Sequence, residues 1–322
     1  MNTEVMDFFG LQKSFKQAVF LETAYSKQLI QNIKHAISNG GIIALTGMVG
    51  SGKTTLLRKI QQELTEEKQI IIARSLSTDK KRVTISTLYT ALFLDLVKEK
   101  NFNAPTQPEK RERKFLELLK KHDKPVALFI DEAHDLHGQT LISLKRLIEL
   151  AHDGSRTLSV IVAGHPKLGN ELKRSSMEEV GARTQIFTLC IPKESHIRYC
   201  EWLLKQCSRK EIKPHDIILP EALELLANSL VTPLQINHYL AQALEKAYLT
   251  GCKPITIEII QSVLAPDLDG LEAKLARNGY GLGALCEALN AKSSDVKTYL
   301  RGQLASGKSQ EFNKEIHKLG II

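Results

Sequence analysis

The stretch that decides the fold is residues 47–55, which read Gly47-Met48-Val49-Gly50-Ser51-Gly52-Lys53-Thr54-Thr55. It matches the phosphate-binding pattern G-x-x-x-x-G-K-S/T and joins a β-branched run, 42–46, to an amphipathic pattern at about 53–66. The glycines allow backbone N–H groups to turn toward phosphates, and the start of a helix adds partial positive charge. The expected nucleotide-binding residues are Gly47, Val49, Gly50, Ser51, Gly52, Lys53, Thr54 and Thr55.

A pair of carboxylates supplies the second half of the expected site. Residues 127–134 read Ala127-Leu-Phe-Ile-Asp-Glu-Ala-His134, an apolar strand that ends in Asp131 and Glu132. Side chains alternate along a strand, so these two carboxylates leave the sheet in different directions. We expect Lys53 to reach the β and γ phosphates of ATP, Thr54 and Asp131 to hold Mg²⁺, and Glu132 to orient the attacking water. The alternative is an acidic helix start without catalytic function.

Short apolar runs alternate with amphipathic patterns from about residue 40 to 190, which predicts an α/β fold with a parallel sheet. Five strands are expected, at 42–46, 69–74, 126–130, 158–163 and 186–189, with helices between them on both sides of the sheet. After residue 192 the patterns are helical, and turn-forming residues at 265–270 indicate a linker. We therefore predict a nucleotide-binding domain with an N-terminal extension at 1–190, a helical lid at 191–266 and a small all-α module at 267–322.

Two further polar residues stand near strand ends. His165 follows the run 158–163 and could sense the γ-phosphate or its water, or it could be an ordinary turn histidine. Arg183 precedes the last expected strand, from where an arginine can reach the nucleotide of a neighbouring subunit. It could equally be a surface arginine. His134, Asp135 and His137 lack cysteine companions, so their spacing does not favour a metal site.

Composition favours a polyanionic partner. Of 322 residues, 44 are Lys or Arg and 36 are Asp or Glu, which gives a net charge of +8. Arg74, Lys80, Lys81 and Arg82 cluster just beyond the second expected strand and are candidates for sequence-independent contacts with double-stranded DNA, or simply a solvated loop. The module at 267–322 contains a helix-turn-helix-like pattern, but its charge is near neutral, so it could dock on DNA or on protein.

Other features bear on the compartment. The five cysteines are scattered and none forms a Cys-x-x-Cys pair, which fits a reducing environment. Residues 1–10 lack a basic patch followed by an apolar stretch, so they do not resemble a secretory signal, and no run of 18 apolar residues occurs. We expect a cytoplasmic protein that does not span a membrane.

Several segments, in this order along the chain, resemble a known family. They are Phe8-Phe-Gly-Leu11, Phe20-Leu-Glu-Thr-Ala24, the loop 47–55, Asp131-Glu-Ala-His134 and Ala163-Gly-His-Pro-Lys-Leu168. They resemble AAA+ P-loop ATPases of the ExeA type, and among these most resemble the ATP-binding subunits of DNA transposition systems, related to TniB, TnsC and MuB. The resemblance covers about residues 6–265 and implies strand order 5-1-4-3-2, a lid, ATP at subunit interfaces, and rings or helical filaments, often on DNA.

The same resemblance assigns roles to individual residues. Lys53 and Thr54 match the first ATP motif (Walker A), and Asp131 and Glu132 match the second (Walker B). His165 matches the first sensor, and Arg183 matches the arginine finger supplied in trans. The chain departs from the pattern in the lid, where Val231-Thr-Pro-Leu-Gln235 stands in place of Gly-x-Pro-Arg and the arginine of the second sensor is missing.

From this we expect an oligomeric, Mg²⁺-dependent ATPase, a hydrolase that binds target DNA and recruits or activates a transposase in DNA transposition. Two alternatives remain: an ATPase of the ExeA type that assembles a secretion apparatus, and a nucleotide-gated switch for protein interactions.

Overall fold

The computed structural model describes residues 1–18, 20–75, 83–97, 102–264 and 270–321. They form two compact units. The helical unit comprises 1–23, 48–52 and 190–276, and the sheet unit comprises 24–47, 53–189 and 277–322. Residues 1–23 therefore group with 190–276 rather than with the sheet, and the three-domain division stays a prediction.

Five parallel strands form the sheet, in the order β2-β3-β4-β1-β5. Their bounds are β1 Gly41–Thr46, β2 Ile71–Arg74, β3 Val126–Ile130, β4 Leu158–Gly164 and β5 Thr184–Thr188. Every residue of β3 and β4 is buried, which explains why both read as continuous apolar runs. Because the strands are parallel, β1, β3 and β4 all end at one edge of the sheet, and Thr46 lies opposite Gly164 and Thr188 there.

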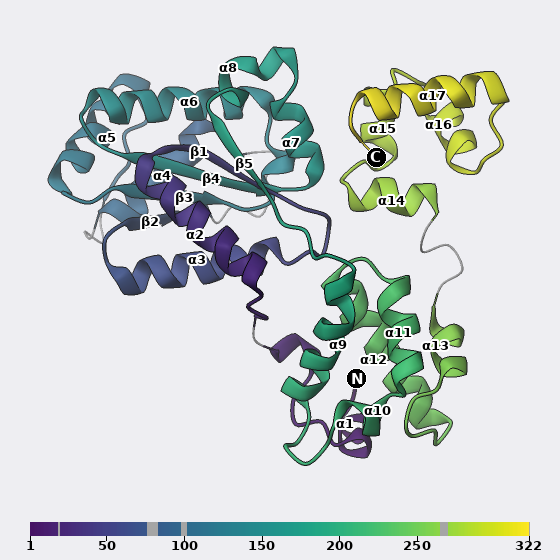
Figure 1. The fold of residues 1–322 in the computed structure, drawn as a ribbon. Coiled ribbons are helices and arrows are strands. Elements are labelled where there is room, and N and C mark those ends of the chain that lie inside the picture. The colour runs from purple at the N-terminus through teal and green to yellow at the C-terminus, as the bar shows by residue number, and fades with distance from the viewer. Residues whose placement is uncertain (19, 76–82, 98–101, 265–269, 322) are drawn as a thin grey trace. The chain divides into compact units, whose positions relative to one another are not determined.

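Helices cover both faces of this sheet. They are α2 Ala24–Asn39, α3 Lys53–Glu67, α4 Ile85–Leu96, α5 Pro108–Lys121, α6 Gly138–Asp153, α7 Pro166–Leu172 and α8 Glu178–Gly181, with short 3₁₀ turns at Ala133–Asp135 and Ser175–Met177. Figure 1 shows α2 and α3 together on one face and α5 and α6 on the other, and each pair is in contact. Ser159 of β4 is buried and donates a hydrogen bond to the carbonyl of Ile37 in α2, which ties the helix to the sheet.

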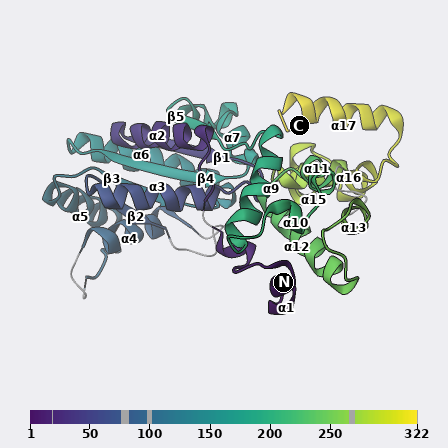
Figure 2. The ribbon, with the colours of Figure 1, turned by 60° about the horizontal axis from the view of Figure 1, so that its bottom comes forward.

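The helical unit consists of short and medium helices around a second core (Figure 2). They are α1 Thr3–Phe9, the 3₁₀ turn Phe15–Gln17, α9 Glu194–Cys207, α10 Pro214–Ile217, α11 Pro220–Ser229, α12 Pro233–Leu249 and α13 Ile257–Val263. The helix α14 Leu271–Arg277 follows and contributes no residue to that core. Phe9 is fully buried in this core, and α1 contacts α12. Thr232 begins α12 as a capping box with Gln235, and Pro233 occupies the first helical position.

The C-terminal segment, residues 277–321, belongs to the sheet unit and carries α15 Leu282–Ala288, α16 Ser293–Leu300 and α17 Ser306–Lys318. Its two first helices contact each other, as the sequence pattern predicted. Tyr299 of α16 stacks edge-on against Phe312 of α17 and donates a hydrogen bond to Asn313.

The predicted fold class is confirmed: a five-stranded parallel sheet flanked by helices, with a helical C-terminal region. The strand order is the one that the family resemblance implied. Among the described residues, no helix combines the length and apolarity needed to cross a membrane.

Candidate active site

Lys53 is the first residue of α3, and its side chain is buried. Its side chain is 6% exposed, and Nζ donates a hydrogen bond to the carbonyl of Gly47 at 2.8 Å. Burial lowers the pKa of Lys53, and the nearby carboxylates Glu132 and Asp131 oppose that shift. The ammonium therefore lies at the start of the helix, beside the point where β1 ends, with two acidic groups close enough to influence it.

The glycine loop has the backbone that phosphate binding requires. Gly50 and Gly52 have φ of 79° and 96°, a left-handed region that side chains rarely adopt. Within the helical unit, a Cβ on Gly50 would lie 2.6 Å from Cβ of Leu234, so this glycine also allows a close approach to the start of α12. Ser51 Oγ is buried and has no hydrogen-bond partner among the described residues. A buried polar atom of this kind fits a loop built to receive a polar ligand.

The predicted Mg²⁺ residues are in direct contact. Thr54 Oγ1 donates a hydrogen bond to Asp131 Oδ2 at 2.6 Å, and Asp131 Oδ1 accepts the backbone N–H of Glu132 at 2.9 Å. Thr54 is in the first turn of α3 and Asp131 follows β3, so the contact joins the two predicted motifs. A hydroxyl and a carboxylate are the oxygen donors that Mg²⁺ takes in phosphate sites, and the pair therefore fits the ion.

Glu132 directly follows Asp131 but has a different environment. Its φ is 55°, an unusual left-handed conformation for a residue with a side chain, and such conformations concentrate at functional sites. Its side chain is 48% exposed, so water can reach it. The backbone at Glu132 thus separates the two carboxylates: Asp131 contacts Thr54, and Glu132 is exposed to solvent.

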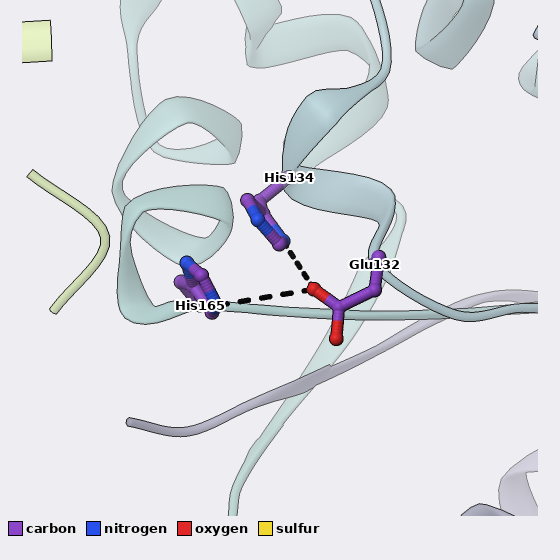
Figure 3. A group of neighbouring side chains, drawn as sticks. All are labelled: Glu132, His134 and His165. Atoms are coloured by element: carbon purple, nitrogen blue, oxygen red, sulfur yellow. Dashed lines mark ion pairs between the residues drawn. The ribbon is translucent and has the colours of Figure 1, made fainter. Parts of the chain in front are cut away.

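Two histidines face the carboxylate of Glu132 (Figure 3). Its Oε2 atom lies 3.3 Å from His134 Nδ1 and 3.8 Å from His165 Nε2. The two imidazole rings are stacked, with centroids 3.6 Å apart and an interplanar angle of 22°. His134 comes from the 3₁₀ turn after β3, and His165 comes from the end of β4. Both contacts are within ion-pair range, and the longer one exceeds the length of a hydrogen bond, so the histidines act on the carboxylate through charge and packing.

The same three side chains offer metal-ligand atoms, all within 4.8 Å of one another. An ion bound by histidine lies near the plane of the imidazole ring. Two nearly parallel rings stacked 3.6 Å apart cannot both meet that condition at a common point unless one of them rotates. The observed arrangement therefore suits the holding of a carboxylate better than the binding of a transition metal.

The remaining predicted residues are less closely tied to the site. Arg183 is 60% exposed and forms an ion pair with Glu149 of α6. Arg74 is exposed at the end of β2, and its backbone N–H donates to Asp95. Thr55 is exposed on α3, and Val49 is 38% exposed. Lys80, Lys81 and Arg82 lie outside the described residues.

Sequence reasoning missed the partnership of His134. It considered His134 with Asp135 and His137, whereas the structure brings His134 to Glu132 and His165. The available signal was the placement of both histidines just after neighbouring strands, because the ends of β3 and β4 meet at one edge of the sheet. The structure also brings Asn278, Gly279 and Tyr280 to this edge, and no motif marked them.

Comparisons with known proteins concern the family and the fold. Residues 34–172 match the family described as AAA domain. General secretion pathway protein A of Aeromonas hydrophila is 27% identical over 151 residues, which is 45% of this chain and 26% of that protein. The match thus spans about a quarter of the length of that relative.

Solved structures with the same fold cover nearly the whole chain. The Aeropyrum pernix ORC2 protein, in ADPNP–ADP complexes, has a TM-score of 0.61 at 13% identity, over 97% of this chain and 91% of that one. Drosophila ORC bound to DNA has a TM-score of 0.55 at 13% identity, over 99% and 79%. Cdc6p of Pyrobaculum aerophilum has a TM-score of 0.52 at 17% identity, over 98% and 90%. At these identities the likeness concerns the fold.

Thr54 and Asp131, which are in contact, both lie within the stretch that matches the AAA domain, and the solved structures share the fold around them.

Proposed function

We propose that this chain is an ATP-dependent, oligomeric DNA-binding ATPase that regulates DNA transposition by binding target DNA and recruiting or activating a transposase. One observation carries the ATPase part: the Lys53 ammonium, the Thr54–Asp131 pair and the Glu132 carboxylate meet at the edge where β1 and β3 end. The transposition role rests on the sequence resemblance and on the positive net charge.

Each residue of the site has a role in this proposal. Lys53 binds the β and γ phosphates in place of its present acceptor, the carbonyl of Gly47. Thr54 and Asp131 would hold Mg²⁺, which neutralises negative charge on the phosphates. Glu132 orients the attacking water and accepts its proton at Oε1, the oxygen that neither histidine faces. His134 and His165 fix that carboxylate from one side, so its free oxygen can face the water.

Arg183 fits a role in trans. Its guanidinium is more than half exposed, and its partner Glu149 is 44% exposed. An exposed ion pair contributes only about 0–1 kcal/mol, so exchanging Glu149 for the γ-phosphate on a neighbouring copy costs little. This supports assembly of several copies, with each arginine completing the site of its neighbour.

DNA binding is the part that rests on charge and resemblance. The net charge of +8 favours a polyanion, and Arg74 is exposed at the sheet edge. One structure of similar fold, Drosophila ORC, is bound to DNA. Contacts to phosphates of this kind are independent of base sequence and weaken steeply with salt.

Fluorescence anisotropy on a random-sequence DNA duplex tests this function. Binding should require a slowly hydrolysed ATP analogue, fall when ADP replaces it, and weaken as salt is raised. Lys53→Ala should abolish the nucleotide-dependent part, while Lys59→Ala, on the same helix, should leave it. Equal binding without nucleotide would contradict the proposal. If an integrase-type gene neighbours this one, its product should join the complex on DNA only with the analogue.

The match to general secretion pathway protein A favours a second candidate, an ATPase of secretion assembly. The DNA assay, run beside a measurement of ATP turnover, separates the two. ATP turnover without nucleotide-dependent binding to DNA would favour the secretion function. Nucleotide binding without turnover, and without stimulation by DNA, would favour a nucleotide-gated switch instead.

A further inference from the structure

Gly279 of the C-terminal segment lies directly against His165. A Cβ on Gly279 would lie 2.7 Å from Cβ and 2.9 Å from Nδ1 of His165, closer than real Cβ contacts. The residue also has a φ of 89°, where a side chain is strained. Glycine at this position is therefore required twice, once by the backbone conformation and once by the histidine beside it.

Several contacts fix the segment at this place. The backbone N–H of Lys167 donates to the carbonyl of Asn278 at 3.3 Å. The side-chain amide of Asn170 donates to Tyr280 Oη and to the carbonyl of Gly320, both at 3.0 Å. Tyr280 is 3% exposed. Because α7 begins at Pro166, these bonds hold both ends of the C-terminal segment on the first turns of the helix that follows His165.

His165 in turn contacts the hydrolytic carboxylate. Its ring stacks on His134, and its Nε2 faces Glu132 Oε2 (Figure 3). Gly279 is on the Nδ1 side of the same ring. The imidazole therefore has the C-terminal segment at one nitrogen and Glu132 at the other.

We propose that residues 278–280 are a positioning element for ATP hydrolysis: they hold the His165 ring against His134 and Glu132, so that turnover depends on docking of the C-terminal segment on α7. This rests on the proposed ATPase activity. The contacts above join the segment to α7 and to His165, whereas the Lys53 ammonium is bonded to Gly47 and Thr54 to Asp131. Release of the segment is therefore expected to change the rate of hydrolysis more than the binding of nucleotide.

Gly279→Ala tests the proposal in the full chain, and the segment offers two matched controls. Gly302→Ala introduces a side chain at a φ of 69°, with no atom within 4 Å of the new Cβ. Gly281→Ala alters a glycine two positions away, also with open space. If backbone strain alone lowered kcat, Gly302→Ala would lower it too. If any change in this part of the segment lowered kcat, Gly281→Ala would lower it too.

We expect Gly279→Ala to lower kcat by about tenfold, since displacement of a catalytic group by about 1 Å can cost up to 100-fold. KM and nucleotide affinity of Gly279→Ala should stay within about twofold of the wild type, because only the catalytic group is displaced. The kcat values of Gly302→Ala and Gly281→Ala should also stay within about twofold of the wild type, because neither variant displaces it. The ring resonances of His165, followed by NMR as pH changes, should shift in Gly279→Ala and not in Gly302→Ala. Tyr280→Phe, which removes one anchor, should lower kcat in the same direction and by less.

The outcomes are distinct. If Gly279→Ala hydrolyses ATP like Gly302→Ala while the wild type is active and Lys53→Ala is not, the positioning role is overturned and the proposed function stands. If kcat and nucleotide affinity fall together, the segment supports the whole site and the specific proposal is wrong. If the wild type hydrolyses no ATP, the proposed function fails and the role of the contact in hydrolysis fails with it.

Discussion

Two places in the sheet unit bring polar groups together, and they do so differently. At the ends of β1 and β3, the groups come from two motifs, and the contact between them, Thr54 Oγ1 to Asp131 Oδ2, is 2.6 Å long. On α7, the C-terminal segment is bound by backbone groups and one asparagine, at 3.0–3.3 Å. The first region carries the residues proposed for hydrolysis, and the second carries the contacts proposed to hold His165. Sequence motifs mark the first region, and no motif marks the second.

Glu132→Gln should give the largest effect, because it removes the only charge proposed to accept the proton of water. Hydrolysis should fall by about 10²–10⁴-fold, the usual contribution of a general base. ATP should still bind, since the Lys53 and Thr54–Asp131 contacts remain. Phosphate release under single-turnover conditions, with ATP binding by calorimetry, measures both.

The matched control is Glu117→Gln, on the exposed face of α5. A Glu132→Gln variant that turns over at the wild-type rate would mean that the unusual backbone at residue 132 serves structure alone.

Lys53→Ala should weaken ATP binding roughly 10- to 100-fold, from about 1.5–3 kcal/mol for a hydrogen bond to a charged group. The loss should appear in affinity, whereas Glu132→Gln affects the rate. Titration calorimetry with Mg²⁺ and ATP gives the comparison. Unchanged ATP affinity would mean that the Lys53 ammonium does not bind the nucleotide. The distinction between a nucleotide-binding region and a positioning contact on α7 would then be wrong.

Burial of Lys53 also predicts that folding stability and ATP affinity depend on pH. As pH rises, the first should increase and the second should decrease. Its folded-state pKa is lowered, chiefly by burial, so between that pKa and the ordinary value the unfolded chain binds more protons. The contribution of Lys53 to stability therefore rises as pH rises through this window and is lost as pH falls below it. Phosphates bind the ammonium, so ATP affinity should fall over the same window.

Lys53→Met should remove the part of both trends that Lys53 contributes, so the difference between the two pH profiles isolates it from the other titrating groups. Denaturant unfolding and calorimetry at stepped alkaline pH, on the wild type and the variant, measure them. Identical pH profiles for wild type and Lys53→Met would show that this lysine is protonated as freely as a surface one.

The sheet was predictable because burial of its central strands is visible in their own composition. Strands β3 and β4 are buried on both faces, and such strands must be apolar throughout. The helix α2 was missed, because its apolar positions Leu29, Ile33 and Ile37 precede the first recognised strand and no motif drew attention to them. The helix α1 was missed for another reason: seven residues, including Val5 and Phe9, are too few to show a period.

The site was predictable where residues come in sequence motifs, and not where contacts are distant. The phosphate loop and the carboxylate pair are each a short motif that follows a predicted strand of one parallel sheet, so Lys53, Thr54 and Asp131 were expected at one site. Which group would face Glu132 depended on the backbone of residue 132 and on the order of β3 and β4. Gly279 had no signal at all, since a lone glycine in a turn shows neither its φ nor its neighbour.

The smallest predicted effect concerns the contact on α7 itself. Asn170 and Tyr280 share one hydrogen bond, and a double-mutant cycle with Asn170→Ala and Tyr280→Phe should give a coupling of about 0.5–1.5 kcal/mol. Exchange protection of the Lys167 amide, which donates to Asn278, is the measurement, because it reports docking of the segment rather than global unfolding. Tyr299 and Asn313 form the same kind of bond inside the segment, so Tyr299→Phe is the control and should leave the Lys167 amide unchanged. If both tyrosine variants expose that amide equally, the segment docks as one rigid body. Glu132 would then respond to the folding of α15–α17 as a whole and not to the Asn170 anchor.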